Sequence, residues 1–125
     1  MKSIIKTSLA PEPIGPYSQA VVCGNLVFVS GQVGKDAATG NIRNENIEVE
    51  TKQVMNNIKV ILEAAGSSLD KVLKTTIFLT SMDYFGKVNT VYASYFSGNY
   101  PARETVEVSR LPANVNVEIS VIAEI

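Results

Sequence analysis

The sequence has no histidine, no tryptophan and only one cysteine, Cys23, among its 125 residues. Without histidine, the chain can form no Ser-His or Cys-His pair and no ordinary histidine-containing metal site. A single cysteine cannot form an internal disulfide, which is typical of a cytoplasmic protein. Any chemistry must therefore depend on arginine, carboxylate, hydroxyl, backbone amide and water, and we expect no cofactor.

An excess of charge of either sign is also missing. Eleven basic and twelve acidic residues give a net charge of −1, so no basic field exists to hold a nucleic acid. No apolar run approaches the ~20 residues of a membrane span. Residues 31–35, Gly-Gln-Val-Gly-Lys, lack the length and order of a phosphate-binding loop and indicate a turn. We expect a protein with no nucleic-acid partner and no membrane partner.

The hydrophobic content is 46%, which is enough for the core of one domain spanning 1–125. Gly24-Asn25 between two apolar runs predicts a hairpin. Apolar residues at steps of three and four predict one helix from about Glu48 to Ala65 and another that begins at Ser81 or Asp83. Strands are predicted at 2–7, 17–23, 26–32, 72–80, 103–109 and 115–124. The fold class is therefore α+β, with two helices on one face of a mixed sheet of about six strands.

Strand parity then separates core residues from polar ones. Val72–Thr80 is predicted to place Leu73, Ile77 and Leu79 on one side. In the last strand, alternate valine and isoleucine residues from Val115 to Val121 should meet the helices, which turns Glu118 to the other face. In the neighbouring strand, 103–109, Arg103 alternates with Val106 and Val108, which are taken as core residues. We therefore expect Arg103 on that other face, with Glu118. Such a pair is either an ordinary surface ion pair or part of a site.

A set of short motifs resembles the RidA/YjgF family of reactive-intermediate imine deaminases. Together the motifs cover nearly the whole chain in the family's order. They are Gly15–Ala20 (GPYSQA), Val29–Gln32 (VSGQ), Asn57–Lys59 (NIK), Glu63–Gly66 (EAAG), Val88-Asn89 with Tyr92, Pro101–Arg103 (PAR), Val106–Pro112 (VEVSRLP) and Val117–Ile119 (VEI).

The resemblance implies a chorismate-mutase-like fold and a homotrimer with a cleft at each subunit interface. It also implies cofactor-free hydrolysis of 2-imino acids, such as 2-iminobutanoate and 2-iminopropanoate, to 2-oxo acids and ammonia. Arg103 would hold the substrate carboxylate through two charge-assisted hydrogen bonds. Glu118 would assist the attacking water or the departing ammonia. The remaining substrate-binding positions would be Tyr17, Ser30, Gly31, Asn89 and Thr105.

Two residues depart from the family pattern. Glu104 stands where the family commonly has serine or alanine, although parity turns it away from Arg103. Thr105 stands where many members have cysteine, so thiol chemistry does not transfer. Tyr92 fits the core stripe of its helix and is interpreted as packing, while Asn89 could equally face solvent.

Two other functions remain open. A non-catalytic regulator or chaperone-like protein could use the same arginine to sense a small carboxylate. Ribonuclease activity has been attached to relatives, but the sequence offers neither a histidine base nor a basic patch for it.

Overall fold

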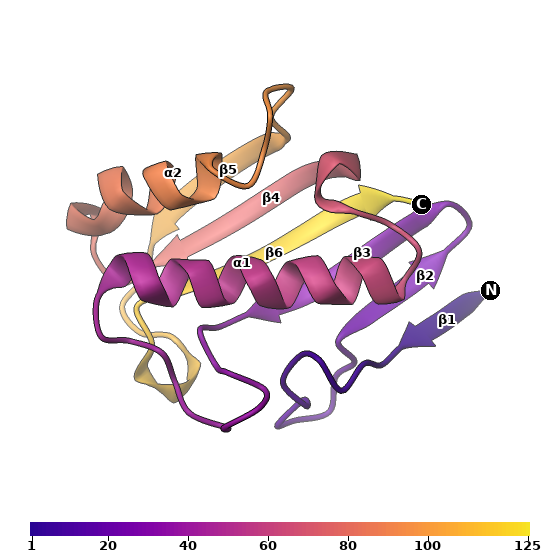
Figure 1. The fold of residues 1–125 in the computed structure, drawn as a ribbon, viewed down its shortest axis with the longest axis horizontal. Coiled ribbons are helices and arrows are strands. Elements are labelled where there is room, and N and C mark those ends of the chain that lie inside the picture. The colour runs from indigo at the N-terminus through magenta and orange to yellow at the C-terminus, as the bar shows by residue number, and fades with distance from the viewer.

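One six-stranded mixed sheet with two helices on the same face makes up the fold (Figure 1). The computed structural model describes all of residues 1–125. The strand order is β1-β2-β3-β6-β4-β5, and the α+β prediction is confirmed. The elements are β1 Lys2–Ile5, β2 Ala20–Cys23, β3 Leu26–Gln32, α1 Ile47–Ala64, β4 Val72–Leu79, α2 Phe85–Ala93, β5 Ala102–Glu107 and β6 Val117–Glu124. Neither helix is long and apolar enough to cross a membrane.

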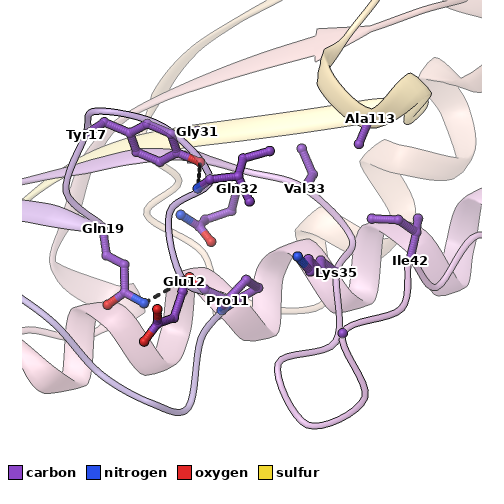
Figure 2. A pocket seen from close by; sticks show the side chains of 12 residues that line it. Pro11, Glu12, Tyr17, Gln19, Gly31, Gln32, Val33, Lys35, Ile42 and Ala113 are labelled. Carbon is purple, nitrogen blue, oxygen red and sulfur yellow. Dashed lines mark hydrogen bonds between the residues drawn. The ribbon is translucent and has the colours of Figure 1, made fainter.

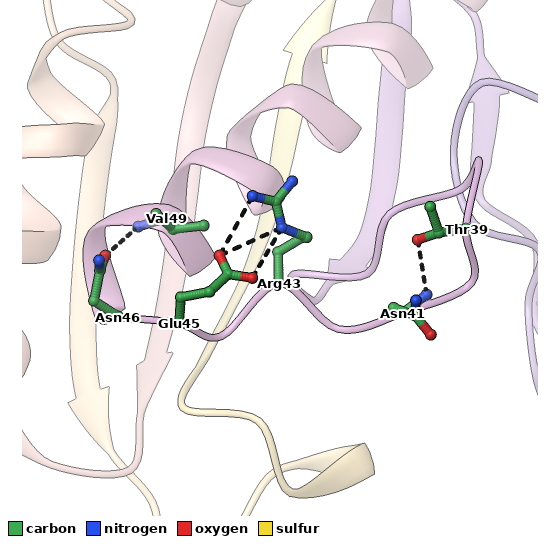
Figure 3. Close-up of polar contacts among 6 residues, drawn as sticks. All are labelled: Thr39, Asn41, Arg43, Glu45, Asn46 and Val49. Carbon is green, nitrogen blue, oxygen red and sulfur yellow. Dashed lines mark hydrogen bonds and ion pairs between the residues drawn. The ribbon is translucent and has the colours of Figure 1, made fainter.

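Helix α1 lies along the middle of the sheet and forms much of the core. Asn46 caps its start, since the side-chain oxygen accepts a hydrogen bond from the Val49 amide at 2.8 Å (Figure 3). Gly66 ends it with φ +82°, a conformation that glycine adopts without steric cost. The fully buried side chains of the helix are Glu50, Thr51, Val54, Met55, Ile58, Ile61 and Leu62. Burial of each aliphatic side chain contributes about 1.5–3 kcal/mol.

A buried carboxylate ties α1 to the start of β6. Glu50 is fully buried and accepts hydrogen bonds from the Asn116 backbone amide at 2.8 Å and the Asn116 side-chain amide at 2.9 Å. The Val117 amide donates a third at 3.3 Å. These bonds satisfy a group whose burial would otherwise be costly, and they fix the backbone just before Glu118.

The predicted hairpin is present, with Cys23 opposite Leu26 and Gly24 at φ +61°. The side assignment of Leu73 is wrong, however. The pairing of β4 with β6 shifts between Val72 and Lys74, so Leu73 is left 46% exposed while Val72, Ile77 and Leu79 are buried. Such a bulge inserts one residue and reverses the parity of everything before it.

The predicted face of Arg103 is also wrong. Strand β5 pairs in parallel with β4, and Arg103 lies beside Thr75, which is fully buried under α2. Arg103 is therefore on the helix-covered face. Glu118 lies beside Phe78 on the open face, as predicted. The alternation failed because Val106, taken as a core residue, is 41% exposed on the open face of an edge strand.

The open face of the sheet carries several apolar side chains. Phe28 of β3 lies beside Ile122 of β6 and is 42% exposed. Phe78 and Val106 are paired across β4 and β5 on the same face. This face therefore carries more apolar side chains than a sheet face in contact with water usually does.

Candidate active site

The predicted site residues form two separate groups, one on each face of the sheet. The first group lies where β5 meets α2. Arg103 is the second residue of β5, two residues after Pro101, and Asn89 lies on the neighbouring face of α2. Both line a cavity of about 360 Å³, together with Tyr92, Ala93, Tyr100 and Pro101. We call this the arginine cavity.

Arg103 has no acidic partner. The ion pairs of the chain are Lys6–Glu12, Arg43–Glu45 and Lys74–Glu104, and none includes it. Its guanidinium carbon instead lies 5.1 Å from the ring centre of Tyr92 and 5.8 Å from that of Phe85. Stacking on aromatic rings holds the cation in place while leaving its N–H groups free. The arrangement can therefore accept an anion.

The Tyr92 ring, which supports the Arg103 guanidinium, is itself held in place by a hydrogen bond. The Tyr92 hydroxyl donates a hydrogen bond to Thr75 Oγ1 at 2.9 Å, within the core. Burial raises the pKa of Tyr92, and Thr75 and Arg103 partly oppose that shift. The interpretation of Tyr92 as packing was therefore incomplete, because the ring packs in the core and also supports the guanidinium.

Thr105 lies two residues beyond Arg103 on the same side of β5. Its hydroxyl oxygen is buried and has no hydrogen-bond partner within the chain. Buried hydroxyls are nearly always paired, so this one is a candidate for a bond to a ligand or to another molecule. The structure thus brings Arg103, Thr105 and Asn89 to one region.

The second group lies on the open side, near the irregularity in the pairing of β3 with β6 between Val29 and Gln32. Glu118 of β6 lines a cavity of about 370 Å³ with Tyr17, Ser30 and Gly31. Its other walls come from Ile14, Val33, Pro112 and Ala113. We call this the glutamate cavity. Tyr17 is half exposed, and its hydroxyl oxygen accepts a hydrogen bond from the Ile14 amide at 3.4 Å (Figure 2).

Glu118 is close to Gly31 and free of partners. No hydrogen bond or ion pair involves its carboxylate, and burial raises the pKa of that group above its ordinary 4.5. A Cβ atom on Gly31 would lie 2.8 Å from Glu118 Cδ, so only glycine allows the carboxylate to occupy this place. A half-buried carboxylate whose pKa is raised by burial is suited both to accept and to return a proton.

Ser30 is held rather than free. Its hydroxyl donates to the Ser18 carbonyl at 2.6 Å, and its amide donates to the Gln19 carbonyl at 2.9 Å. These bonds attach the Tyr17 segment to β3. Ser30 can still accept a hydrogen bond from a ligand, since the hydroxyl oxygen keeps its lone pairs.

Glu104 does not disturb the arginine cavity. As parity predicts, it lies on the opposite face from Arg103, where it pairs with Lys74 at 3.1 Å and accepts a hydrogen bond from Thr76. These two partners lower the pKa of Glu104, the Thr76 bond being the larger influence. The charge is therefore locally compensated.

Comparison with known proteins identifies the relatives of this fold and site. The family model described as Endoribonuclease L-PSP matches residues 7–125. The chain belongs to the RidA/YjgF family. A RutC family protein of Pyrococcus horikoshii is 54% identical over 98% of both chains. A protein of Mus musculus named 2-iminobutanoate/2-iminopropanoate deaminase is 43% identical, over 98% of this chain and 91% of its own.

Solved structures of RidA/YjgF relatives agree closely with the fold. A putative endoribonuclease from Thermotoga maritima is 53% identical, with a TM-score of 0.97 and coverage of 100% of this chain and 98% of that one. RidA from an Antarctic Psychrobacter is 44% identical, with a TM-score of 0.96 over 98% and 99% of the two chains. Some relatives carry the deaminase name and others only a family name, so membership gives the family and not the reaction.

Sequence reasoning missed several residues that shape the RidA-like site. Phe85 and Tyr92 support Arg103, and Ile14 and Ala113 line the glutamate cavity. The role of Tyr92 could have been predicted, because it follows Asn89 by three residues and residues at that spacing share a helix face. Ala113, in contrast, reaches the cavity through a turn with φ +60°, which alanine rarely adopts and no pattern predicts.

Proposed function

We propose that this protein hydrolyses small 2-imino acids, such as 2-iminobutanoate and 2-iminopropanoate, to 2-oxo acids and ammonia. The observation that carries the proposal is the Arg103 guanidinium, which lies on two aromatic rings without an acidic partner. A planar guanidinium binds a carboxylate through two parallel hydrogen bonds and so fixes its orientation. The deaminase name of relatives at 43–44% identity gives independent support for this class of substrate.

The reaction consumes one water, and it starts from the imine in its protonated form. Glu118 takes a proton from water as the oxygen forms a bond to the imine carbon, which gives a neutral carbinolamine. Glu118 then gives that proton to the amine nitrogen, the carbon–nitrogen bond breaks as ammonia leaves, and the hydroxyl group loses its proton to solvent as the carbonyl forms. The raised pKa of Glu118 suits it to both roles. Since an imine carbon is already electrophilic, holding the reactants together supplies much of the rate.

Arg103 and Glu118 can act on one substrate only if two copies of the chain meet. The two residues lie on opposite faces of the sheet, as the pairing of each with β4 requires. We therefore propose that the arginine cavity of one copy is placed against the glutamate cavity of the next. Contacts of this head-to-tail kind close into rings, and the homotrimer implied by the resemblance is such a ring. The apolar open face supports the same assembly.

A coupled assay tests the proposed reaction. A threonine dehydratase generates 2-iminobutanoate, and the appearance of 2-oxobutanoate is followed with and without the protein. We expect acceleration that is lost in Arg103→Ala and kept in Arg43→Ala, a matched control whose guanidinium pairs with Glu45 outside both cavities (Figure 3). Equal rates with and without the wild-type protein would contradict the proposal.

A non-catalytic carboxylate sensor is the alternative that the same assay separates. In that case the dehydratase product would form no faster, while 2-oxobutanoate would still bind in calorimetry. Binding that is lost in Arg103→Ala without any acceleration would favour the sensor.

A further inference from the structure

Glu50, in the first turn of α1, is a fully buried acid that the proposed reaction does not use. None of the three ion pairs of the chain includes it. Its hydrogen-bond donors are amide groups of two neighbouring residues, Asn116 and Val117. A buried carboxylate needs several donors to offset the loss of water, so its place in the core is set by those two residues.

Glu50 contacts both of the strands that form the glutamate cavity. Its Oε2 accepts hydrogen bonds from the backbone amides of Asn116 and Val117, the two residues that directly precede Glu118. Its stem lies against Gly34, two residues beyond the end of β3, where a Cβ atom would lie 2.9 Å from Glu50 Cγ. Helix α1 lies over β3 and β6 (Figure 1). One side chain therefore links the helix, the exit of β3 and the start of β6.

Pairing between the strands does not by itself set the distance from Glu118 to Gly31. The regular pairing of β3 with β6 is interrupted between Val29 and Gln32, and Gly31 lies within this interruption. The contact is nevertheless close, since a Cβ atom on Gly31 would lie 2.8 Å from Glu118 Cδ. Something other than the strand ladder must hold the two residues at this separation.

The β3 side of the contact has an attachment of its own. Asn57 of α1 is 2% exposed, and its Nδ2 donates to the carbonyls of Val33 and Lys35 at 3.1 and 2.9 Å. The Gln53 side chain donates in turn to Asn57 Oδ1 at 2.9 Å. Because these bonds fix the exit of β3 independently, a change at Glu50 acts mainly on the β6 side, which carries Glu118.

We infer that Glu50 is a positioning residue, which holds the Glu118 carboxylate against Gly31 through the amides of Asn116 and Val117. The inference rests on the proposed function, which gives Glu118 the proton transfers. The length of the Glu50 side chain matters more than its charge, because the amides need an acceptor oxygen at a fixed distance from α1. A displacement of about 1 Å at a reacting group can lower a rate about a hundredfold.

Two substitutions of Glu50 separate length from charge. Glu50→Asp keeps the charge but withdraws the acceptor, so kcat in the coupled 2-iminobutanoate assay should fall at least about tenfold. KM should stay within about twofold, because Arg103 still binds the substrate carboxylate. Glu50→Gln keeps the length, and the Asn116 side-chain amide can turn over to face it, so kcat should stay within about threefold of wild type. An active Glu50→Asp beside an inactive Glu50→Gln would overturn the inference.

A second readout separates positioning from a general loss of stability. The carboxyl carbon of Glu118 is titrated by NMR without substrate, in protein labelled at glutamate Cδ, and its signal is assigned by its absence from Glu118→Gln. Burial raises the pKa of Glu118, so release from Gly31 in Glu50→Asp should move the midpoint toward 4.5. Glu50→Gln should keep the wild-type midpoint.

Ile61→Ala is the matched control for stability. Ile61 is fully buried on α1, about three turns beyond Glu50, and its truncation leaves a cavity in the core. Thermal unfolding followed by circular dichroism checks that each variant is folded at the assay temperature. We expect Ile61→Ala to be less stable than the wild type but to keep the wild-type midpoint and kcat.

The outcomes distinguish this inference from the proposed function. A fall in kcat of Glu50→Asp with a wild-type midpoint would show general destabilisation and refute the inference. Wild-type kcat and midpoint in Glu50→Asp would also refute it, while the deaminase function stands. If the wild-type protein accelerates no imine hydrolysis, the proposed function fails, and the titration alone still decides whether Glu50 holds Glu118 in place.

Discussion

We proposed a cleft in which the arginine cavity of one copy faces the glutamate cavity of the next. Mixing two inactive variants tests this shared cleft most directly. Arg103→Ala removes the anion site from the face covered by α2, and Glu118→Gln removes the proton-transfer group from the open face. Each variant alone should be inactive, because every cleft lacks one of the two groups. If the chains assemble into the proposed ring, mixed rings contain some clefts that join the intact Arg103 of one copy to the intact Glu118 of another.

The fraction of activity that mixing should recover can be calculated from random assembly of the two variants. With equal amounts and random assembly, a given cleft draws its arginine side from the Glu118→Gln copy half the time and its glutamate side from the Arg103→Ala copy half the time. About a quarter of the clefts are then complete, so about a quarter of wild-type activity per chain should return. The variants are denatured together, refolded and assayed with 2-iminobutanoate over a series of mixing ratios, and activity should be greatest at equal amounts.

The same series can refute the reasoning. If each chain contained its own complete site, no mixing ratio would restore activity, since every chain would carry one defect. Refolding each variant separately before mixing is the control, and it should give no recovery unless subunits exchange.

Three further predictions concern single residues. Gly31→Ala places a Cβ 2.8 Å from Glu118 Cδ, so kcat should fall about a hundredfold while urea denaturation is unchanged; an unaltered kcat would show that the carboxylate position does not matter. Because burial raises the pKa of Glu118 and the ionised form takes the proton from water, kcat should be lost as pH falls through a midpoint above 4.5; a midpoint at or below 4.5 would exclude this role. Glu50→Leu removes the acceptor of three amide donors and should lower the free energy of unfolding, measured by urea denaturation, by about 3 kcal/mol or more. Glu50→Gln keeps an acceptor oxygen, so its loss should be smaller. Equal losses in the two variants would contradict the account.

The order and type of the elements could be predicted because local signals agree with the fold. Helix α1 has both a regular apolar stripe and a glycine at its end, and the β2–β3 hairpin has a Gly-Asn turn. Such signals are contained in a few neighbouring residues. The positions of strands within the sheet are not, since β6 lies between β3 and β4 through contacts made far along the chain.

The candidate site was predicted in its residues but not in its arrangement. Family motifs gave Arg103, Glu118 and the residues around them. The face of Arg103 was predicted wrongly because the apolar Val106 was taken to mark the core face of β5. Pairing of β5 with β4, which the sequence does not show, puts Arg103 beside the buried Thr75 and Val106 on the open face. The bulge near Leu73 could not be predicted from the sequence either, because an extra residue within a strand does not change the type of residues that the strand contains.

The central place of β6 has a consequence for synthesis in the cell. Val117–Glu124 is the last strand in sequence, yet it joins the β1-β2-β3 unit to the β4-β5 unit. While the ribosome has not yet released these residues, the nascent chain holds two half-sheets with unpaired edges at β3 and β4. Such edges are prone to pair with other chains. Emergence of this one short segment therefore pairs both of these edges and joins the two half-sheets into one continuous six-stranded sheet.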